Sequence, residues 1–431
     1  MLKALKRKKR VMPDKKTLLA LKIGLVLLIL IFIFIVIYRP HTSYPYPIHA
    51  DEWMHANAVA SGNILDKEIG FYISLYPISK VFNLIQIYQY LPAIWACVSA
   101  LALFWFMLYL TRNYWISLLS MAFFSALKSN ANIMGVWFFV PFVFALPFCY
   151  LTLYFLDRGL KTRKMKFFIF ATLSLFYVIT CHGSIGALIF AISAVSLLVR
   201  FSELKENKRG VALYLLAPLA ASVMLVIVTS PLNEISKTFT GIIMRYIQGE
   251  WLGGFTPALS ILRVSSISSV VAALVGAIFA LKNKKQRVLV IWCTVCLIPV
   301  LLEMVNIHFV VRPQRAFYYL MMGMAPLSAI GLYNTIKFVA DHSKKVIAII
   351  ISIILVLMVF INAFYGYYDI NYQSASKYTI GLYYCYSPEN KGDLQYQLEH
   401  SPCFPLNYSS LEPLVMSYNN MMSHSNNTKP V

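Results

Sequence analysis

The chain has 431 residues, of which 59% are hydrophobic and only 13% are charged, and its formal net charge is +21. An average soluble domain carries about 25% charged residues, so this composition excludes an ordinary soluble protein. The basic residues form short clusters between apolar runs, as in the cytoplasmic loops of membrane proteins, which argues against nucleic acid as a partner. These clusters lie at 6–10, 158–166, 205–209 and 282–287.

In chain order, residues 1–17 form a basic N-terminus that we expect on the cytoplasmic side. The apolar stretch at 18–38 is too long for a removed signal peptide and lacks a small-residue cleavage site, so it predicts a retained helix. Further apolar stretches predict an all-α polytopic membrane protein, with about eleven transmembrane helices within 18–366. The later ten lie at 91–110, 114–129, 136–156, 167–181, 184–200, 211–229, 265–281, 288–306, 316–336 and 346–366.

This arrangement keeps the strongly basic loops inside and places other segments outside. The external segments are expected at 39–90, at 230–264 and in the tail 367–431. We therefore expect a multi-pass protein of the cell membrane with a cytoplasmic N-terminus and an extracytoplasmic C-terminus. The first external loop is expected to carry short interfacial helices, one of them at 52–61.

The first external loop begins with the sequence IHADEWMH at 48–55, which places Asp51 and Glu52 side by side. Adjacent residues of a helix point in different directions, so the two carboxylates are expected to have different roles. A carboxylate at this position can serve as a catalytic base near the membrane surface. The alternative is that Asp51 only caps the N-terminus of the helix at 52–61.

These residues resemble the first external loop of the GT-C membrane glycosyltransferases. The matching positions are His49, Asp51, Glu52 and His55, followed by Leu75-Tyr76-Pro77 and by WFFVPFVFALPF at 137–148. The resemblance covers roughly the first 200 residues. The family includes protein O-mannosyltransferases, aminoarabinose lipid A transferases and oligosaccharyltransferase catalytic subunits. The chain has no WWDYG-type motif, so a complete oligosaccharyltransferase subunit is not expected.

The resemblance implies a GT-C-like bundle that transfers a sugar from a polyprenyl-phosphate-linked donor to an acceptor protein, lipid or glycan. Asp51 would be the base, or a ligand of a divalent metal such as Mg²⁺ or Mn²⁺, and Glu52 would support it. His49, His55 and Tyr76 would then contact the substrate. The spacing of the histidines differs from the HExxH pattern, so a zinc protease is a weak alternative.

An arginine is expected to hold the donor phosphate, because its planar guanidinium binds phosphate oxygens in pairs. Arg312 and Arg315 lie at the outer end of the tenth predicted helix, three residues apart and therefore on one face. The alternative is that both extend to lipid headgroups beside aromatic residues. Glu303, at the outer end of the ninth helix, is expected to pair with one of them.

Further candidates for substrate binding lie elsewhere on the external side. His182 follows the fifth predicted helix and either contacts the donor phosphate or caps the helix. Arg245 lies in the second external loop, which is either a mobile lid or an interfacial helix. Cys385 and Cys403 are the external cysteines, and an oxidising exterior would allow them to form a disulfide.

Two other functions are compatible with the same sequence. One is a non-catalytic transporter or flippase of polyprenyl-linked sugars, and the other is an inactive GT-C relative. Transporters commonly show internal repeats and polar residues at the membrane midplane. This chain shows no internal repeat, and its polar residues gather at one predicted face, which favours the enzyme.

Overall fold

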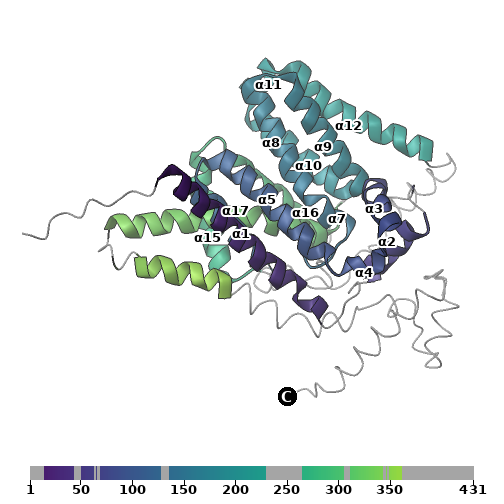
Figure 1. The fold of residues 1–431 in the computed structure, drawn as a ribbon. Coiled ribbons are helices and arrows are strands. Elements are labelled where there is room, and N and C mark those ends of the chain that lie inside the picture. The colour runs from purple at the N-terminus through teal and green to yellow at the C-terminus, as the bar shows by residue number, and fades with distance from the viewer. Residues whose placement is uncertain are drawn as a thin grey trace, which may run out of the picture.

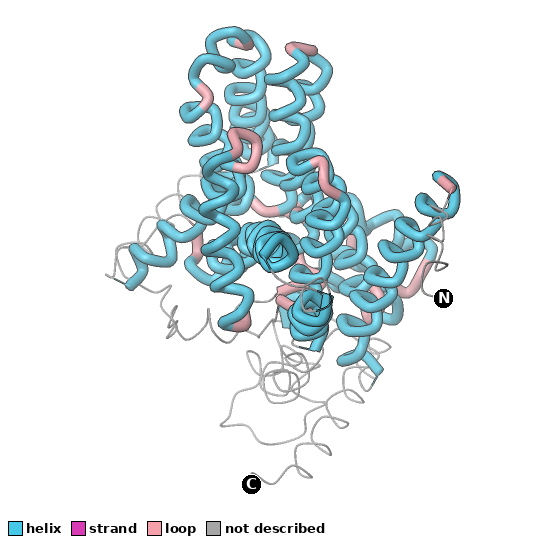
Figure 2. The backbone as a smooth tube through the Cα atoms, turned by 90° about the vertical axis from the view of Figure 1, so that its left-hand side faces the viewer, coloured by secondary structure: helices cyan, strands magenta, loops and turns pink. Residues whose placement is uncertain are grey.

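The computed structural model describes residues 14–42, 50–62, 65, 68–127, 135–229, 265–304, 311–342, 346 and 349–361. These residues form helices joined by short turns and contain no strand (Figure 1). Figure 2 shows the same all-helical backbone from a perpendicular direction. The all-α class is therefore confirmed for the part of the chain that the structure describes.

The helices follow the predicted segments closely, and each of the predicted membrane segments contains one. They are α1 (Lys15–Tyr38), η1 (Arg39–Thr42), α2 (Ala50–Ala60), α3 (Ile69–Val81), α4 (Leu84–Tyr88), α5 (Leu91–Thr111), α6 (Tyr114–Ser125), α7 (Pro141–Phe144), α8 (Leu146–Thr162), α9 (Met165–Cys181), α10 (Gly183–Val199), α11 (Phe201–Glu206), α12 (Lys208–Thr229), α15 (Ile267–Lys282), α16 (Arg287–Met304), α17 (Pro313–His342) and a helix at Ile349–Ile361.

Length and composition are compatible with a polytopic membrane protein. Within the described ranges, four helical segments are long and apolar enough to cross a bilayer: α1, α5, the segment Pro141–Thr162, and α17. Shorter apolar helices accompany them, among them α6, α9, α10 and α15. The number of crossings stays a prediction.

The predicted helix at 136–156 begins at the wrong residue. Residues 136–140 are not helical, α7 begins at Pro141, and α8 carries Pro147 within its first turn. Proline is favoured at the start of a helix, where its missing N–H costs no hydrogen bond. The prolines of this apolar run therefore mark two helix starts and leave the preceding residues as a non-helical segment.

The short helices predicted for the first external loop are present as α2, α3 and α4, and they lie close to one another beside α7 (Figure 1). The capping role suggested for Asp51 is wrong, because α2 begins at Ala50 and Asp51 lies within its first turn. Gly62 follows the helix with φ +80, a left-handed conformation that suits glycine after a helix end.

Helix α17 is buried along most of its length and packs against α15, α16 and α6. Its contact with α15 is backbone to backbone at two glycines. A Cβ added at Gly276 would overlap the carbonyl oxygen of Leu327, and one added at Gly331 would overlap that of Ala272. Small residues of this kind let membrane helices approach closely. The close approach fixes α17, which carries Arg315 at its start.

Candidate functional site

Four segments that are distant in sequence meet at one end of the bundle. They are the first turn of α2, helix α7, the junction of α9 and α10, and the start of α17. Asp51, Phe142, His182 and Arg315 come from these segments in turn, and ion-pair and ring contacts join them. Three of the residues predicted from the sequence are thus brought together with one that was not.

The central contact is an ion pair between Asp51 and Arg315. The Nη2 atom of Arg315 lies 4.0 Å from Oδ2 of Asp51. The Arg315 side chain is only 11% exposed, whereas that of Asp51 is 38% exposed. The pair therefore combines a buried positive charge with a carboxylate that is partly exposed to solvent.

Phe142 provides a platform for the guanidinium of Arg315. The guanidinium carbon lies 3.9 Å from the centre of the Phe142 ring, within the range of a cation–π interaction. The same ring makes edge contacts with Tyr318 at 5.4 Å and with His182 at 5.8 Å between centroids. Phe142 therefore holds Arg315 in place and links it to His182.

The start of α17 explains why Arg315 is buried and Arg312 is not. The carbonyl oxygen of Arg312 accepts hydrogen bonds from the N–H groups of Arg315 and Ala316, each at 3.0 Å, and Pro313 begins the helix. Arg312 thus lies just outside the helix with an exposed side chain, while Arg315 is in its first turn. Both positive charges act on His182.

Glu52 is fully buried and connects α2 to the non-helical residues before α7. Its Oε1 atom accepts a hydrogen bond of 2.7 Å from the N–H of Phe139, and the hydroxyl of Tyr88 donates to the carbonyl of the same residue. Burial, and after it the charge of Glu52, raises the pKa of Tyr88 well above its ordinary value, which keeps the hydroxyl a donor. Glu52 therefore supports the segment that leads to Phe142.

We expect Glu52→Ala to lower the free energy of unfolding by about 1–3 kcal/mol, because it leaves a buried N–H group of Phe139 without its carboxylate acceptor. Glu52→Gln keeps an acceptor oxygen and should cost less. Thermal unfolding of the purified protein in detergent measures the difference. Equal melting temperatures for the wild type and Glu52→Ala would show that this hydrogen bond does not contribute to stability.

His55 lies on the buried face of α2 and belongs to a chain of hydrogen bonds. Its Nδ1 atom is 2.9 Å from the hydroxyl of Tyr72, which in turn donates to Oε2 of Glu68 at 3.3 Å. The ring of His55 also contacts that of Phe71 at 5.6 Å. The structure thus places His55 between α2 and α3, and its predicted contact with substrate stays a prediction.

His182 is the single residue between α9 and α10, and its backbone serves both helices. Its N–H donates to the carbonyl of Val178 at 2.9 Å, and its carbonyl accepts from Ile185 and Gly186. Burial first, and then the positive charges of Arg315 and its neighbours, lower the pKa of His182 to about 3. The imidazole is therefore neutral at physiological pH and can accept or donate a hydrogen bond without carrying charge.

This lowered pKa predicts a pH-dependent loss of stability. The unfolded chain binds a proton at His182 below its ordinary pKa of about 6.5, whereas the folded protein does not. Stability should therefore fall as the pH decreases from about 6.5 toward 3, by about 1–2 kcal/mol at pH 5. His182→Gln should remove this part of the decrease when melting temperatures at pH 7 and pH 5 are compared. An identical decrease in both proteins would contradict the prediction.

Two further predicted residues, Tyr76 and Glu303, lie within the described ranges. Tyr76 is half-buried on α3, with the ammonium of Lys80 4.5 Å from its ring centre. Glu303 is buried at the end of α16, and its expected pairing with Arg312 or Arg315 stays a prediction. The candidates outside the described residues are His49, Arg245, Cys385 and Cys403.

The sequence prediction missed Phe142 and Glu68 as parts of the site. Phe142 stands within the quoted WFFVPFVFALPF motif, where one aromatic residue among several gave no sign of its contact with an arginine. Glu68 is a carboxylate of the first external loop, and its charge acts on Arg315. Its acidic character in a mostly basic chain was the signal that could have identified it.

A divalent metal was one predicted partner of Asp51. Mg²⁺ and Mn²⁺ prefer several oxygen ligands. The described ranges contain no group of three or more His, Cys, Asp or Glu side chains that could hold a metal, and Asp51 faces a guanidinium. A metal at Asp51 therefore stays a prediction.

Two comparisons with known proteins gave no match for this chain. No model of a protein family matches the chain, and no curated protein matches it significantly. The class that the described residues define is an all-helical protein with membrane-length helices and a buried arginine beside an accessible carboxylate.

Proposed function

We propose that this protein is an integral membrane glycosyltransferase that moves a sugar from a polyprenyl-phosphate-linked donor to an acceptor on the extracytoplasmic face. The observation that carries the proposal is the contact between Asp51 and Arg315. It joins an accessible carboxylate to a buried guanidinium over a distance of 4.0 Å at the start of a helix. The carboxylate would accept the proton of the acceptor hydroxyl, and the guanidinium would bind the departing phosphate.

Asp51 would act as the general base. The acceptor oxygen attacks the anomeric carbon of the sugar and gives its proton to the carboxylate, while the bond between that carbon and the phosphate oxygen breaks. The electron pair of the broken bond remains on the polyprenyl phosphate. The 38% exposure of the Asp51 side chain supports this role, because an acceptor can reach it.

Arg315 would stabilise the phosphate as negative charge develops on it. A guanidinium binds phosphate oxygens with two parallel hydrogen bonds, and the start of a helix adds further positive potential. Preorganised positive charge in a site that excludes water is effective in catalysis. The burial of Arg315 and its contact with Phe142 support this role, because they fix the guanidinium before the donor binds.

The location of the site agrees with a lipid-linked donor. Phe142 and Asp157 belong to consecutive helical segments α7 and α8 and are 15 residues apart in the sequence, which corresponds to roughly 22 Å along a helix. The basic clusters at 158–166, 205–209 and 282–287 lie near Asp157, at the end of α8 away from the site. If those clusters mark the cytoplasmic side, the site lies near the external surface, where the donor phosphate would be.

The proposal includes the membrane arrangement predicted from the sequence. Eleven crossings with a cytoplasmic N-terminus would put the C-terminal tail and the site on the same extracytoplasmic side. The helices found in all the predicted segments support this number.

A donor panel tests the proposed function. The purified protein in detergent would receive polyprenyl-phosphate sugars, the corresponding nucleotide sugars, and acceptor mixtures of peptide, lipid and glycan. We expect release of free polyprenyl phosphate from at least one carrier-linked donor and no use of nucleotide sugars. A parallel reaction with EDTA would show whether a divalent metal is needed. Carrier binding without release would support a transporter or an inactive relative instead.

A further inference from the structure

A second site is present at the other end of the bundle. A pocket opens between α5, α8, α10 and α16. Its walls are mainly apolar side chains from these four helices: Phe106, Leu110, Leu153, Leu156, Leu160, Leu197, Val199, Val288 and Ile291. These apolar walls suit contact with a hydrocarbon chain.

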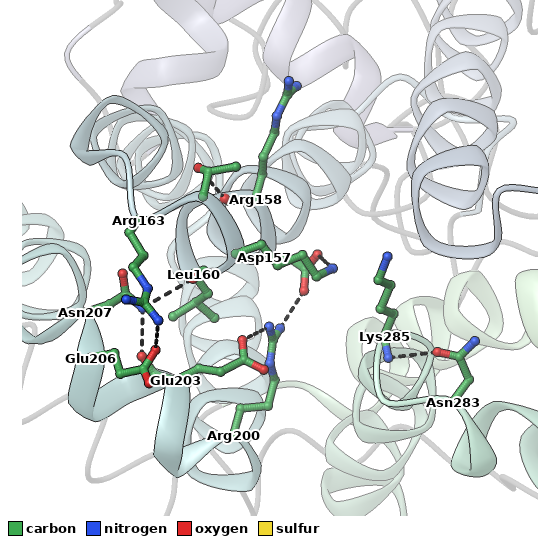
Figure 3. A network of polar contacts seen from close by, with 12 residues as sticks. Asp157, Arg158, Leu160, Arg163, Arg200, Glu203, Glu206, Asn207, Asn283 and Lys285 are labelled. Atoms are coloured by element: carbon green, nitrogen blue, oxygen red, sulfur yellow. Dashed lines mark hydrogen bonds and ion pairs between the residues drawn. The ribbon is translucent and has the colours of Figure 1, made fainter.

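Four positively charged side chains and one carboxylate also line the pocket. Asp157 forms an ion pair with Lys161. It also pairs with Arg200, which in turn pairs with Glu203 (Figure 3). The charge of Asp157 is therefore already balanced within the protein. The other three cations lie in the turn between α15 and α16 and at the first residue of α16.

These three cations are Lys284, Lys285 and Arg287. Within the described ranges, no carboxylate lies within 4 Å of any of their charged nitrogens, although the guanidinium of Arg287 donates one hydrogen bond to the carbonyl of Leu281. The pocket thus has an apolar interior and an excess of positive charge. Such a combination is complementary to a molecule with a hydrocarbon chain and an anionic head.

We propose that this pocket binds an anionic phospholipid. Lys284, Lys285 and Arg287 would hold the phosphate of the headgroup, and one acyl chain would lie along the apolar walls. Basic clusters at the ends of membrane helices attract anionic lipids of the cytoplasmic leaflet, and basic pockets between such helices bind lipid headgroups. The apolar walls favour a lipid over inorganic phosphate, which would gain nothing from them.

This inference does not depend on sugar transfer. The pocket lies at the end of α8 that carries Asp157, whereas Phe142 and the candidate active site precede the other end of that helix. Loss of lipid binding and loss of transferase activity can therefore be observed separately. If the protein had no enzymatic activity, the proposed lipid site would be unaffected.

Native mass spectrometry of the full-length protein in detergent tests the site directly. The protein would be titrated with phosphatidylglycerol, with phosphatidylcholine of the same acyl chains, and with inorganic phosphate. We expect bound phosphatidylglycerol at concentrations where phosphatidylcholine does not bind. Equal binding of the two lipids, or displacement of phosphatidylglycerol by inorganic phosphate, would overturn the proposal.

Two variants and a matched control make the test specific. The triple variant Lys284→Gln, Lys285→Gln, Arg287→Gln should weaken phosphatidylglycerol binding at least about tenfold, because each basic side chain near an anionic lipid contributes severalfold. The control removes three exposed charges of the same end that do not line the pocket, at Lys164, Lys208 and Arg209, and should bind normally. Equal losses in both triple variants would overturn the site in favour of general attraction.

A further variant distinguishes the contribution of the apolar walls to lipid binding from that of the basic side chains. Val288→Trp keeps all three cations but fills part of the apolar interior, and it should also weaken lipid binding at least about tenfold. Melting temperatures of all variants show whether each one is folded. Unchanged lipid binding by a folded Val288→Trp protein would place the lipid outside the pocket.

Discussion

Arg315→Gln is expected to slow the release of polyprenyl phosphate by about a hundredfold or more. The substitution removes the buried charge that forms an ion pair with Asp51, and loss of a single preorganised donor to developing negative charge typically has an effect of this size. Arg315→Lys should recover part of the rate, because lysine restores the charge without the planar fork. Initial rates with a saturating donor measure both effects.

Arg312 offers a matched control for this prediction. Its side chain is exposed and lies just before α17, so Arg312→Gln removes the same charge three residues away. We expect a smaller loss, mainly in donor affinity. Equal rates for the wild type and a folded Arg315→Gln protein would show that this arginine does not act on the phosphate and would favour a role in packing or lipid contact.

Gly276→Ala is expected to destabilise the protein by about 3 kcal/mol or more. The added Cβ would overlap the carbonyl oxygen of Leu327, and backbone atoms cannot move aside as a flexible side chain can. The close packing of α15 on α17 would then open, and yield and melting temperature in detergent should both fall.

Gly24→Ala is the matched control, because it makes the same change in α1, where an added Cβ meets nothing within 4 Å. This variant should be as stable as the wild type or slightly more stable, since alanine favours a helix over glycine. Similar melting temperatures for Gly276→Ala and Gly24→Ala would contradict the close packing of α15 on α17.

Much of the helical architecture follows from apolar patterning alone. The stretches long enough for membrane helices contain helices in the described residues, because a run of apolar residues in lipid must satisfy its own backbone hydrogen bonds. The boundaries near Pro141 were harder to predict, since the surrounding residues are equally apolar and do not show where a helix starts.

The candidate site could be predicted only in part. The acidic pair stood out because charge is rare in this chain, and the structure confirms that Asp51 and Glu52 face different surroundings. Which of the two carboxylates is exposed and which is buried depends on the residue at which α2 begins. The contact of Arg315 with Phe142 depends on three-dimensional packing across 173 positions of sequence, which no local pattern contains.

The two ends of the bundle have different chemistry. One end combines Asp51, Arg315 and His182 around an aromatic ring, and the other surrounds an apolar pocket with basic side chains. Figure 1 shows α11 at the far end of α8 and α10 from α7, which separates the two regions along the same helices. A protein that takes its donor from one leaflet and is anchored to lipids of the other would need this division.

If Asp51 is the base of a transferase, Asp51→Asn should release polyprenyl phosphate far more slowly than the wild type does. Asparagine preserves the shape of the side chain but cannot accept a proton, so we expect at least about a hundredfold loss of rate in a protein that still binds the donor. The exposed Asp341→Asn at the far end of α17 should retain the wild-type rate. Equal rates of release by the wild type and Asp51→Asn would show that Asp51 is not the base.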